Sequence, residues 1–263
     1  MSAMASLRRA RGTVRLLTTT ATVVATMAAF AVAAGGSASG AATTGDASPS
    51  YNLHTSSDCR SEERLAHRGI AHPDRRVDVD GDGRRDKVAV VTDSDARKAC
   101  RVVVAVKVRG GAAYSAVLDP SAVPPRGVRA RIEAMPDLGN DPGVEIVIDS
   151  RMKADGVLAQ LFTLTRDGLE RVPMPAFEDG NFYVEGGGVT YPRGASCNAR
   201  GAMILSMAIL ERGRYEVTRH VYPVKGDRLR LTGPRMKVAH VPGDELVDRF
   251  PEFGSRHFTA CSA

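Results

Sequence analysis

The chain has 263 residues, 43% hydrophobic and 25% charged, and its 36 basic and 30 acidic side chains give a net charge of +6. Four arginines lie within the first 15 residues, so the remainder, with 32 basic and 30 acidic side chains, is nearly neutral. The chain has no tryptophan and only 5% aromatic residues, so it shows neither the basic stripe nor the stacking platform of a nucleic-acid-binding protein. We therefore expect no nucleic-acid partner.

The first 34 residues read as an export signal. The four arginines are followed by residues 16–34, which are uncharged and rich in Ala, Val and Thr. A retained single-span anchor is the alternative, because about 19 uncharged residues nearly cross a bilayer. The threonines in this segment and the lack of a basic flank after it favour a cleaved signal peptide over residues 1–34. We expect a secreted protein without a stable membrane anchor, and the cleavage position stays open.

Residues 35–57 form the next segment and are rich in Ala, Gly, Ser and Thr. Such a composition cannot bury enough apolar surface to offset the entropy of ordering. We expect a flexible linker over 35–57, followed by one domain over 58–263.

Four cysteines in an exported chain suggest two disulfides. They are Cys59, Cys100, Cys197 and Cys261. Three pairings are possible, and we favour Cys59 with Cys100 and Cys197 with Cys261, because each bond would fasten a tail to the nearest strands. A zinc site built from all four is the alternative, but the sequence has no C-x-x-C pair.

The stretch 78–91 carries the clearest chemistry in the chain. Acidic side chains at alternate positions can converge on one hard cation, and Gly83 permits the sharp turn that such a loop needs. The pattern predicts a calcium site whose ligands are the carboxylates of Asp78, Asp80, Asp82 and Asp86 and the carbonyl of Arg84. Without a cation these carboxylates would repel one another.

The calcium loop differs from the helix-loop-helix calcium hand. The twelfth position, where that hand has a bidentate Glu, is Ala89, and residues 87–92 are β-branched, which predicts a buried strand. A site without that Glu and close to several arginines should bind calcium weakly, with a dissociation constant on the order of 0.1 to 1 mM. The alternative is that the arginines neutralise the aspartates as solvated ion pairs and that no metal binds.

Residues 77–90, Val-Asp-Val-Asp-Gly-Asp-Gly-Arg-Arg-Asp-Lys-Val-Ala-Val, resemble the calcium loop and first strand of FG-GAP (VCBS-type) repeats. Those repeats are known from the β-propellers of integrin α-chains and from secreted bacterial proteins. The resemblance covers one repeat, and it implies short antiparallel sheet units with calcium bound between two strands.

A second copy of the loop begins 59 residues later, since residues 137–148 align without gaps on the stretch that starts at residue 78. Gly139 replaces the second aspartate and Pro142 replaces the turn glycine. Three acidic positions remain: Asp137, Asp141 and Glu145. This loop is a weaker candidate metal site, and the alternative is a turn kept for its backbone capping.

Hairpin patterns follow both loops and recur a third time without a recognisable calcium loop. We expect an all-β fold of repeated short antiparallel sheet units, with approximate bounds 75–135, 136–180 and 181–263. Three to four units correspond to a small or incomplete β-propeller. A β-sandwich-like domain, or a ring completed by several chains, is the alternative.

Catalytic motifs are missing from the sequence. It contains no G-x-S-x-G elbow, no H-E-x-x-H helix and no phosphate-binding glycine loop. We therefore assign no catalytic residue and expect a secreted calcium-binding module with an unknown protein or glycan ligand. Two alternatives stay open: a secreted hydrolase whose distant residues meet on the same scaffold, and an inhibitor or partner of a secreted enzyme.

Overall fold

The computed structural model describes residues 59, 62–139, 143–153, 156–174, 181–225, 228–229, 236–254 and 257–261. All described residues belong to one compact unit within Ser48–Ala263. The predicted signal peptide and linker therefore lie outside the described residues. No helix in the described part has the length and apolar character needed to cross a membrane.

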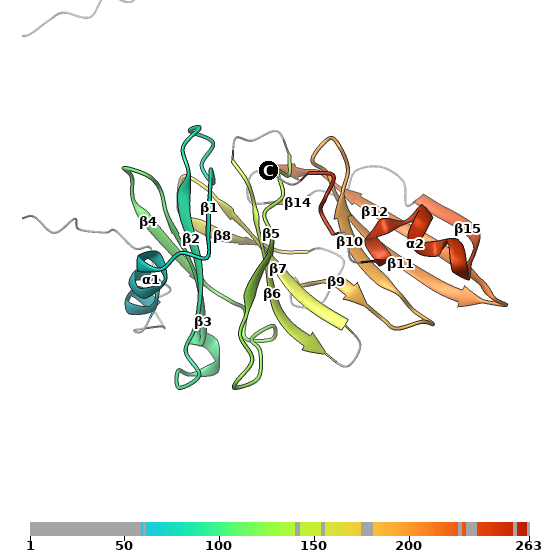
Figure 1. The fold of residues 1–263 in the computed structure, drawn as a ribbon, viewed down its shortest axis with the longest axis horizontal. Helices are drawn as coiled ribbons and strands as arrows, with labels where there is room; N and C mark the ends of the chain where they lie inside the picture. The colour runs from blue at the N-terminus through green and yellow to red at the C-terminus, as the bar shows by residue number, and fades with distance from the viewer. Residues whose placement is uncertain are drawn as a thin grey trace, which may run out of the picture. The chain divides into compact units, whose positions relative to one another are not determined.

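The described chain is mostly antiparallel β-structure in open sheets, which confirms the predicted all-β class (Figure 1). The first sheet has the order β1-β2-β3-β4. Its strands are β1 (Arg75–Val77), β2 (Asp86–Thr92), β3 (Val102–Lys107) and β4 (Ala113–Val117). Strands β2 and β3 consist mostly of valine and alanine, whose side chains alternate between two covered faces.

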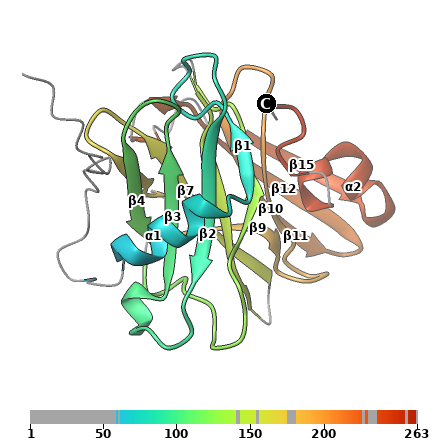
Figure 2. The same ribbon diagram turned by 60° about the vertical axis from the view of Figure 1, so that its left-hand side comes forward.

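Two helical segments accompany this sheet, one before it in the sequence and one between two of its strands. Helix α1 (Glu62–Ala71) lies across one face of the sheet (Figure 2), and the 3-10 turn η1 (Lys98–Cys100) joins β2 to β3. Leu65 and Ala66 of α1 share a buried cluster with Val91, Val103 and Ala105 of the sheet. The helix thus covers the outer apolar face of the first sheet.

The second sheet is longer and has the order β15-β12-β11-β10-β9-β7-β6-β5, with β8 paired to β7. Its strands are β5 (Arg131–Ala134), β6 (Ile146–Lys153), β7 (Gly156–Leu164), β8 (Leu169–Val172), β9 (Phe182–Gly186), β10 (Arg193–Cys197), β11 (Met203–Glu211), β12 (Arg214–Tyr222) and β15 (Met236–Pro242). A small hairpin joins β13 (Val224–Lys225) to β14 (Arg228–Leu229). The segments η3 (Gly243–Glu245), α2 (Leu246–Arg249) and η4 (Pro251–Phe253) follow β15.

The second sheet forks along one edge of β7. Residues 161–164 of this strand pair with β8, whereas residues 156–159 pair with β9. The fork separates two groups of strands. If the first sheet is counted as the first group, the second group is β5 to β8, and the third group is β9 to β12 with β15. Because β5 pairs with β6, the second group begins at Arg131.

Buried clusters fill the space between these groups. Val104 of the first sheet shares a cluster with Ile148 and Phe162 of the second group, while Leu161 shares another with Phe182 of the third. Neighbouring residues 161 and 162 therefore point to opposite faces of β7, as the two-residue period of a strand requires. The three groups of strands are stacked face to face on these two cores.

The outer face of the third group is also covered by the chain itself. Leu246 of α2 and Phe250 share a buried cluster with Ala208, Tyr215 and Val217 of β11 and β12. Figure 1 shows α2 and η4 beside β11, β12 and β15. Both outer faces of the stack thus have a helical cover.

The two favoured disulfides are present, which confirms the predicted pairing. Cys59 is bonded to Cys100 and Cys197 to Cys261, and the described residues contain no free cysteine. The first bond ties the residues before α1 to η1, and the second ties residue 261 to β10. Each bond fastens a peripheral segment to a sheet.

Candidate functional site

Three of the predicted metal-ligating carboxylates come together. One ligand atom from each of Asp78, Asp80 and Asp86 lies within 4.8 Å of the other two. Asp78 and Asp80 lie in the loop between β1 and β2, and Asp86 is the first residue of β2. A group of three carboxylates on a short loop is a donor set that suits a hard cation such as calcium.

The loop is wrapped around Asp78. The carboxylate of Asp78 accepts hydrogen bonds from the backbone N–H groups of Gly81 (2.7 Å), Asp82 (3.1 Å) and Gly83 (2.8 Å). Gly81 and Gly83 have φ angles of 75° and 81°, a region that glycine enters without strain. The alternation of aspartate and glycine therefore fixes the turn that brings Asp80 next to Asp78.

Asp86 is fully buried and joins two turns. Its carboxylate accepts the N–H of Val79 at 2.9 Å and the N–H of Arg109, in the β3–β4 turn, at 2.8 Å. These donors occupy one lone pair on each oxygen, and a carboxylate oxygen has two. Asp86 can thus hold the loop in place and still face a cation.

Asp82 and Arg84 lie outside the three-carboxylate group. The carboxylate of Asp82 accepts the N–H of Arg84 at 2.7 Å and so closes its own turn, and both residues are exposed. Of the five predicted ligands, the structure gathers the carboxylates of three.

Asp80 shows the electrostatic strain of the group. Its partial burial, followed by the negative charges of Asp86, Asp82 and Asp78, raises the pKa of its carboxyl, and a hydrogen bond from the Asp82 N–H offsets this in part. The folded loop therefore disfavours the charged form of Asp80. A bound cation would remove that penalty at neutral pH.

The second loop repeats one hydrogen bond of the first among its described residues. The N–H of Leu138 donates to Glu145 Oε2 at 2.8 Å, as the N–H of Val79 donates to Asp86 59 residues earlier. Gly139, which stands where the first loop has Asp80, brings no carboxylate, and Asp141 lies outside the described residues. Among the described acids, Asp137 and Glu145 join no group of three.

A third loop of this kind, between β10 and β11, was missed in the sequence. The side-chain oxygen of Asn198 accepts the N–H groups of Arg200 (2.9 Å) and Ala202 (3.1 Å), much as Asp78 caps the first loop. The loop is shorter than the other two, and it has an amide where they have an acid. An Asn-x-x-Gly turn directly before an apolar strand was the signal for it.

The three loops lie against one another through glycines. A Cβ atom on Gly143 would lie 2.1 Å from the Val79 carbonyl oxygen, and one on Gly201 would lie 2.6 Å from the Gly139 nitrogen. The backbone of each loop therefore touches the previous loop at a position where only glycine fits. The second loop thus contacts the backbone of the first at Val79 and Gly81, beside its aspartates.

A cleft of about 570 Å³ opens beside the first loop. Its walls come from the β1–β2 loop, the β3–β4 turn, the residues before β6, and the β7–β8 turn. The lining combines apolar side chains with Asp80, Glu145, Arg166 and the ring of Tyr114. It holds no His, Ser or Cys among the described residues.

Outside the cleft, His257 lies beside an acidic side chain. His257 Nε2 lies 3.4 Å from Glu185 Oε2, but the buried hydroxyl of Ser196 and His257 Nδ1 make no hydrogen bond to each other. In a catalytic triad the nucleophile is hydrogen-bonded to its base, and the base is hydrogen-bonded to an orienting acid. Ser196, His257 and Glu185 do not form such a chain of hydrogen bonds.

Searches with this chain against family models, curated proteins and solved structures return no match. The FG-GAP resemblance of residues 77–90 accordingly stays a prediction from the sequence.

Proposed function

We propose that this chain is a secreted, calcium-stabilised β-repeat protein of FG-GAP type that binds an extracellular protein or glycan. The observation that carries the proposal is the position of Asp78, Asp80 and Asp86, within 4.8 Å of one another, with Asp80 also in the wall of the cleft. In this proposal each group of strands is one unit of an incomplete propeller.

The geometry of the loop supports the choice of a cation as the bound species. The raised pKa of Asp80, caused first by its partial burial and then by the neighbouring carboxylates, means that its charged form raises the free energy of the folded loop at neutral pH. A hard divalent cation takes carboxylate and carbonyl oxygens at this spacing, and its binding energy would add to the stability of the fold.

The cleft supports a binding role. Ligand sites are commonly apolar concavities with a few fixed polar groups, and this cleft has apolar walls with two acids and one arginine. The two disulfides support an oxidising, extracellular setting, where such bonds persist.

Thermal unfolding with calcium and with chelator tests the proposal. For a dissociation constant of about 0.1 to 1 mM, 10 mM calcium contributes about 1.4 to 2.7 kcal/mol and raises Tm by roughly 3 to 10 °C. Asp80→Asn should abolish that rise. Asp82→Asn, which removes the same charge from an aspartate outside the group, should keep most of it.

Isothermal titration of the same three proteins supplies the direct binding constant. Equal melting curves with calcium and chelator for the wild type, together with no heat of binding, would rule out the metal. Stabilisation that survives in Asp80→Asn would place the cation elsewhere.

A further inference from the structure

The first sheet and the β5–β8 group meet at two edge strands. Among the described strands, β4 pairs only with β3, and β8 pairs only with β7. The two strands lie against each other, yet no described backbone hydrogen bond joins them. Their relative position therefore depends on side chains.

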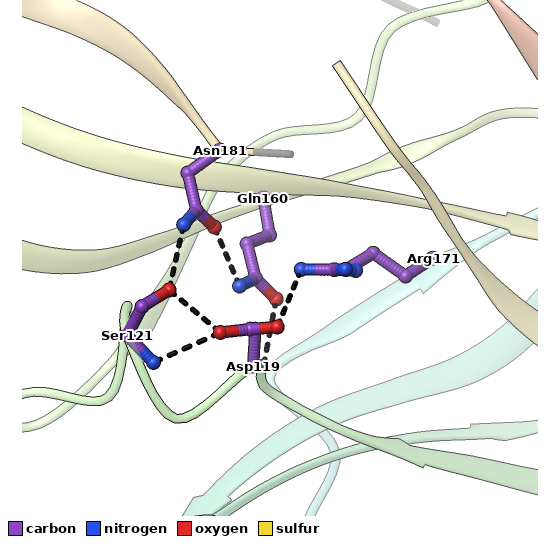
Figure 3. Close-up of polar contacts among 5 residues, drawn as sticks. All are labelled: Asp119, Ser121, Gln160, Arg171 and Asn181. Carbon is purple, nitrogen blue, oxygen red and sulfur yellow. Dashed lines mark hydrogen bonds and ion pairs between the residues drawn. The ribbon is translucent and has the colours of Figure 1, made fainter. Parts of the chain in front are cut away.

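A polar network joins these strands beyond their ends (Figure 3). Arg171 of β8 donates to Asp119 Oδ2 at 3.0 Å, and Asp119 lies just after β4. The other carboxylate oxygen of Asp119 accepts the N–H (2.9 Å) and the hydroxyl (2.6 Å) of Ser121. The ion pair is thus held on the side of the first sheet by a tight turn.

Two buried amides complete the network. The side-chain oxygen of Gln160 accepts the backbone N–H of Asp119 at 3.2 Å, and its side-chain nitrogen donates to Asn181 Oδ1 at 2.6 Å. The side-chain nitrogen of Asn181 donates to the Ser121 hydroxyl oxygen at 2.9 Å. Every amide and hydroxyl has one consistent orientation in this ring. Because Gln160 and Asn181 are buried, breaking one bond would leave desolvated polar groups without partners.

The network lies at the fork of β7. Gln160 is the residue between the part of β7 that pairs with β9 and the part that pairs with β8, and Asn181 directly precedes β9. The five side chains therefore connect the first sheet to both branches of the fork.

The same two edge strands begin at the cleft. Ala112 and Tyr114 at the start of β4, and Thr165 and Arg166 just before β8, line it. Both strands run from the cleft to the network. Tilting β4 away from β8 would widen the cleft, and the Asp119–Arg171 pair resists that movement from the far ends of the strands.

We infer that the network of Asp119, Ser121, Gln160, Asn181 and Arg171 is a clasp that sets the width of the cleft. Its role in ligand binding rests on the proposed function, whereas its mechanical role does not. Arg171 and Asp119 are then positioning residues, which act on the cleft through β4 and β8.

Spin-label distances across the cleft test the clasp. Labels on Arg109→Cys and Asp167→Cys occupy exposed positions in the β3–β4 and β7–β8 turns, and the native cysteines of the described chain are paired, so only the introduced thiols react. We expect a narrow distance distribution in the otherwise native protein. Arg171→Gln and Asp119→Asn should each shift it to longer distances and broaden it.

The matched control is Arg131→Gln, which removes an ion pair of similar length, 2.8 Å from the exposed Arg131 to the buried Asp149, inside the second group. It should leave the distribution unchanged. Circular dichroism of each variant checks that it is folded. A folded Arg171→Gln protein, or a folded Asp119→Asn protein, with the native distribution would overturn the clasp.

Comparing the label distances with the Tm values measured in calcium and in chelator separates the two proposals. If Tm does not respond to calcium but Arg171→Gln still lengthens the label distances, the proposed function alone is contradicted. A normal calcium response with no effect of Arg171→Gln would contradict the clasp alone.

Discussion

At the scale of single residues, Asp80 and Asp119 are opposite cases of a carboxylate in a folded chain. Burial raises the pKa of Asp119, but the Ser121 donors and the Arg171 charge outweigh it and lower the pKa overall. Burial also raises the pKa of Asp80, and its three acidic neighbours add to that rise, with no cationic partner among the causes to oppose them. Asp119, whose charge is balanced by its partners, belongs to the proposed clasp, whereas Asp80, whose charge is not balanced, belongs to the candidate metal site.

The raised pKa of Asp80 predicts a pH-dependent penalty in the absence of metal. A carboxyl whose pKa is higher in the folded state binds its proton more readily there, so its contribution to stability improves as the pH falls through that pKa. In chelator at pH 7, Asp80→Asn should therefore unfold at higher urea concentration than the wild type, and the difference should shrink towards pH 4. Urea midpoints across this range measure it.

Asp167→Asn is the control for Asp80→Asn, because it removes one exposed acid in the β7–β8 turn, away from the three-carboxylate group. Its midpoint should follow the wild type at every pH. An Asp80→Asn variant that is less stable than the wild type in chelator at pH 7 would contradict the assignment of repulsion to this loop.

At the scale of elements, the contact between the first two loops makes Gly143 a sensitive position. Gly143→Ala would introduce both a strained φ of +103° and a Cβ atom 2.1 Å from the Val79 carbonyl oxygen. Gly127→Ala has a similar φ of +85° but nothing within 4 Å of the new atom. We expect about 1 to 3 kcal/mol of destabilisation from backbone strain in both, and a larger loss in Gly143→Ala.

Calcium titration of these two variants links the contact to the candidate site. Displacement of Val79 should move the neighbouring aspartates, so Gly143→Ala should weaken calcium binding and Gly127→Ala should not. Equal effects of the two substitutions on stability and on calcium affinity would show that the loops do not support one another.

The sequence predicted those parts of the fold that depend on local chemistry. The alternating aspartates and the β-branched run after them were sufficient for the loop and for β2, and two tails near strands were sufficient for the disulfide pairing. The fork at Gln160 was not predictable, because it depends on which strand reaches each half of β7. The network of Asp119 was missed for a related reason, since its five members come from separate segments and carry no spacing pattern.

At the scale of the whole described unit, the helical covers bear on assembly. Leu65 on α1 and Leu246 on α2 are buried against the two outer sheet faces, where a further sheet would have to pack. A ring completed by several chains would need those faces to be free. We therefore expect a monomer in sedimentation velocity at micromolar concentration.

Substitutions in the covers extend this prediction. Leu65→Ala should lower stability by about 2 to 5 kcal/mol, the usual cost of removing a buried leucine side chain, and should favour self-association through the loosened face. Val247→Ala, at a half-exposed position of α2, should change neither property measurably. A wild-type protein that sediments as a stable oligomer would contradict the role of the covers.

The hydrogen bond from the Asp137 N–H to the Cys261 carbonyl oxygen, 2.7 Å long, joins positions separated by almost half of the chain. In the proposed export, which would deliver the chain from its N-terminal side, the second loop would have to wait for residue 261 before this bond could form. The first sheet, whose strands are all local in sequence, has no such delay. Folding outside the cell should therefore begin at the aspartate loop and finish at the stack of loops beside it, with oxidation of Cys197 and Cys261 among the late events.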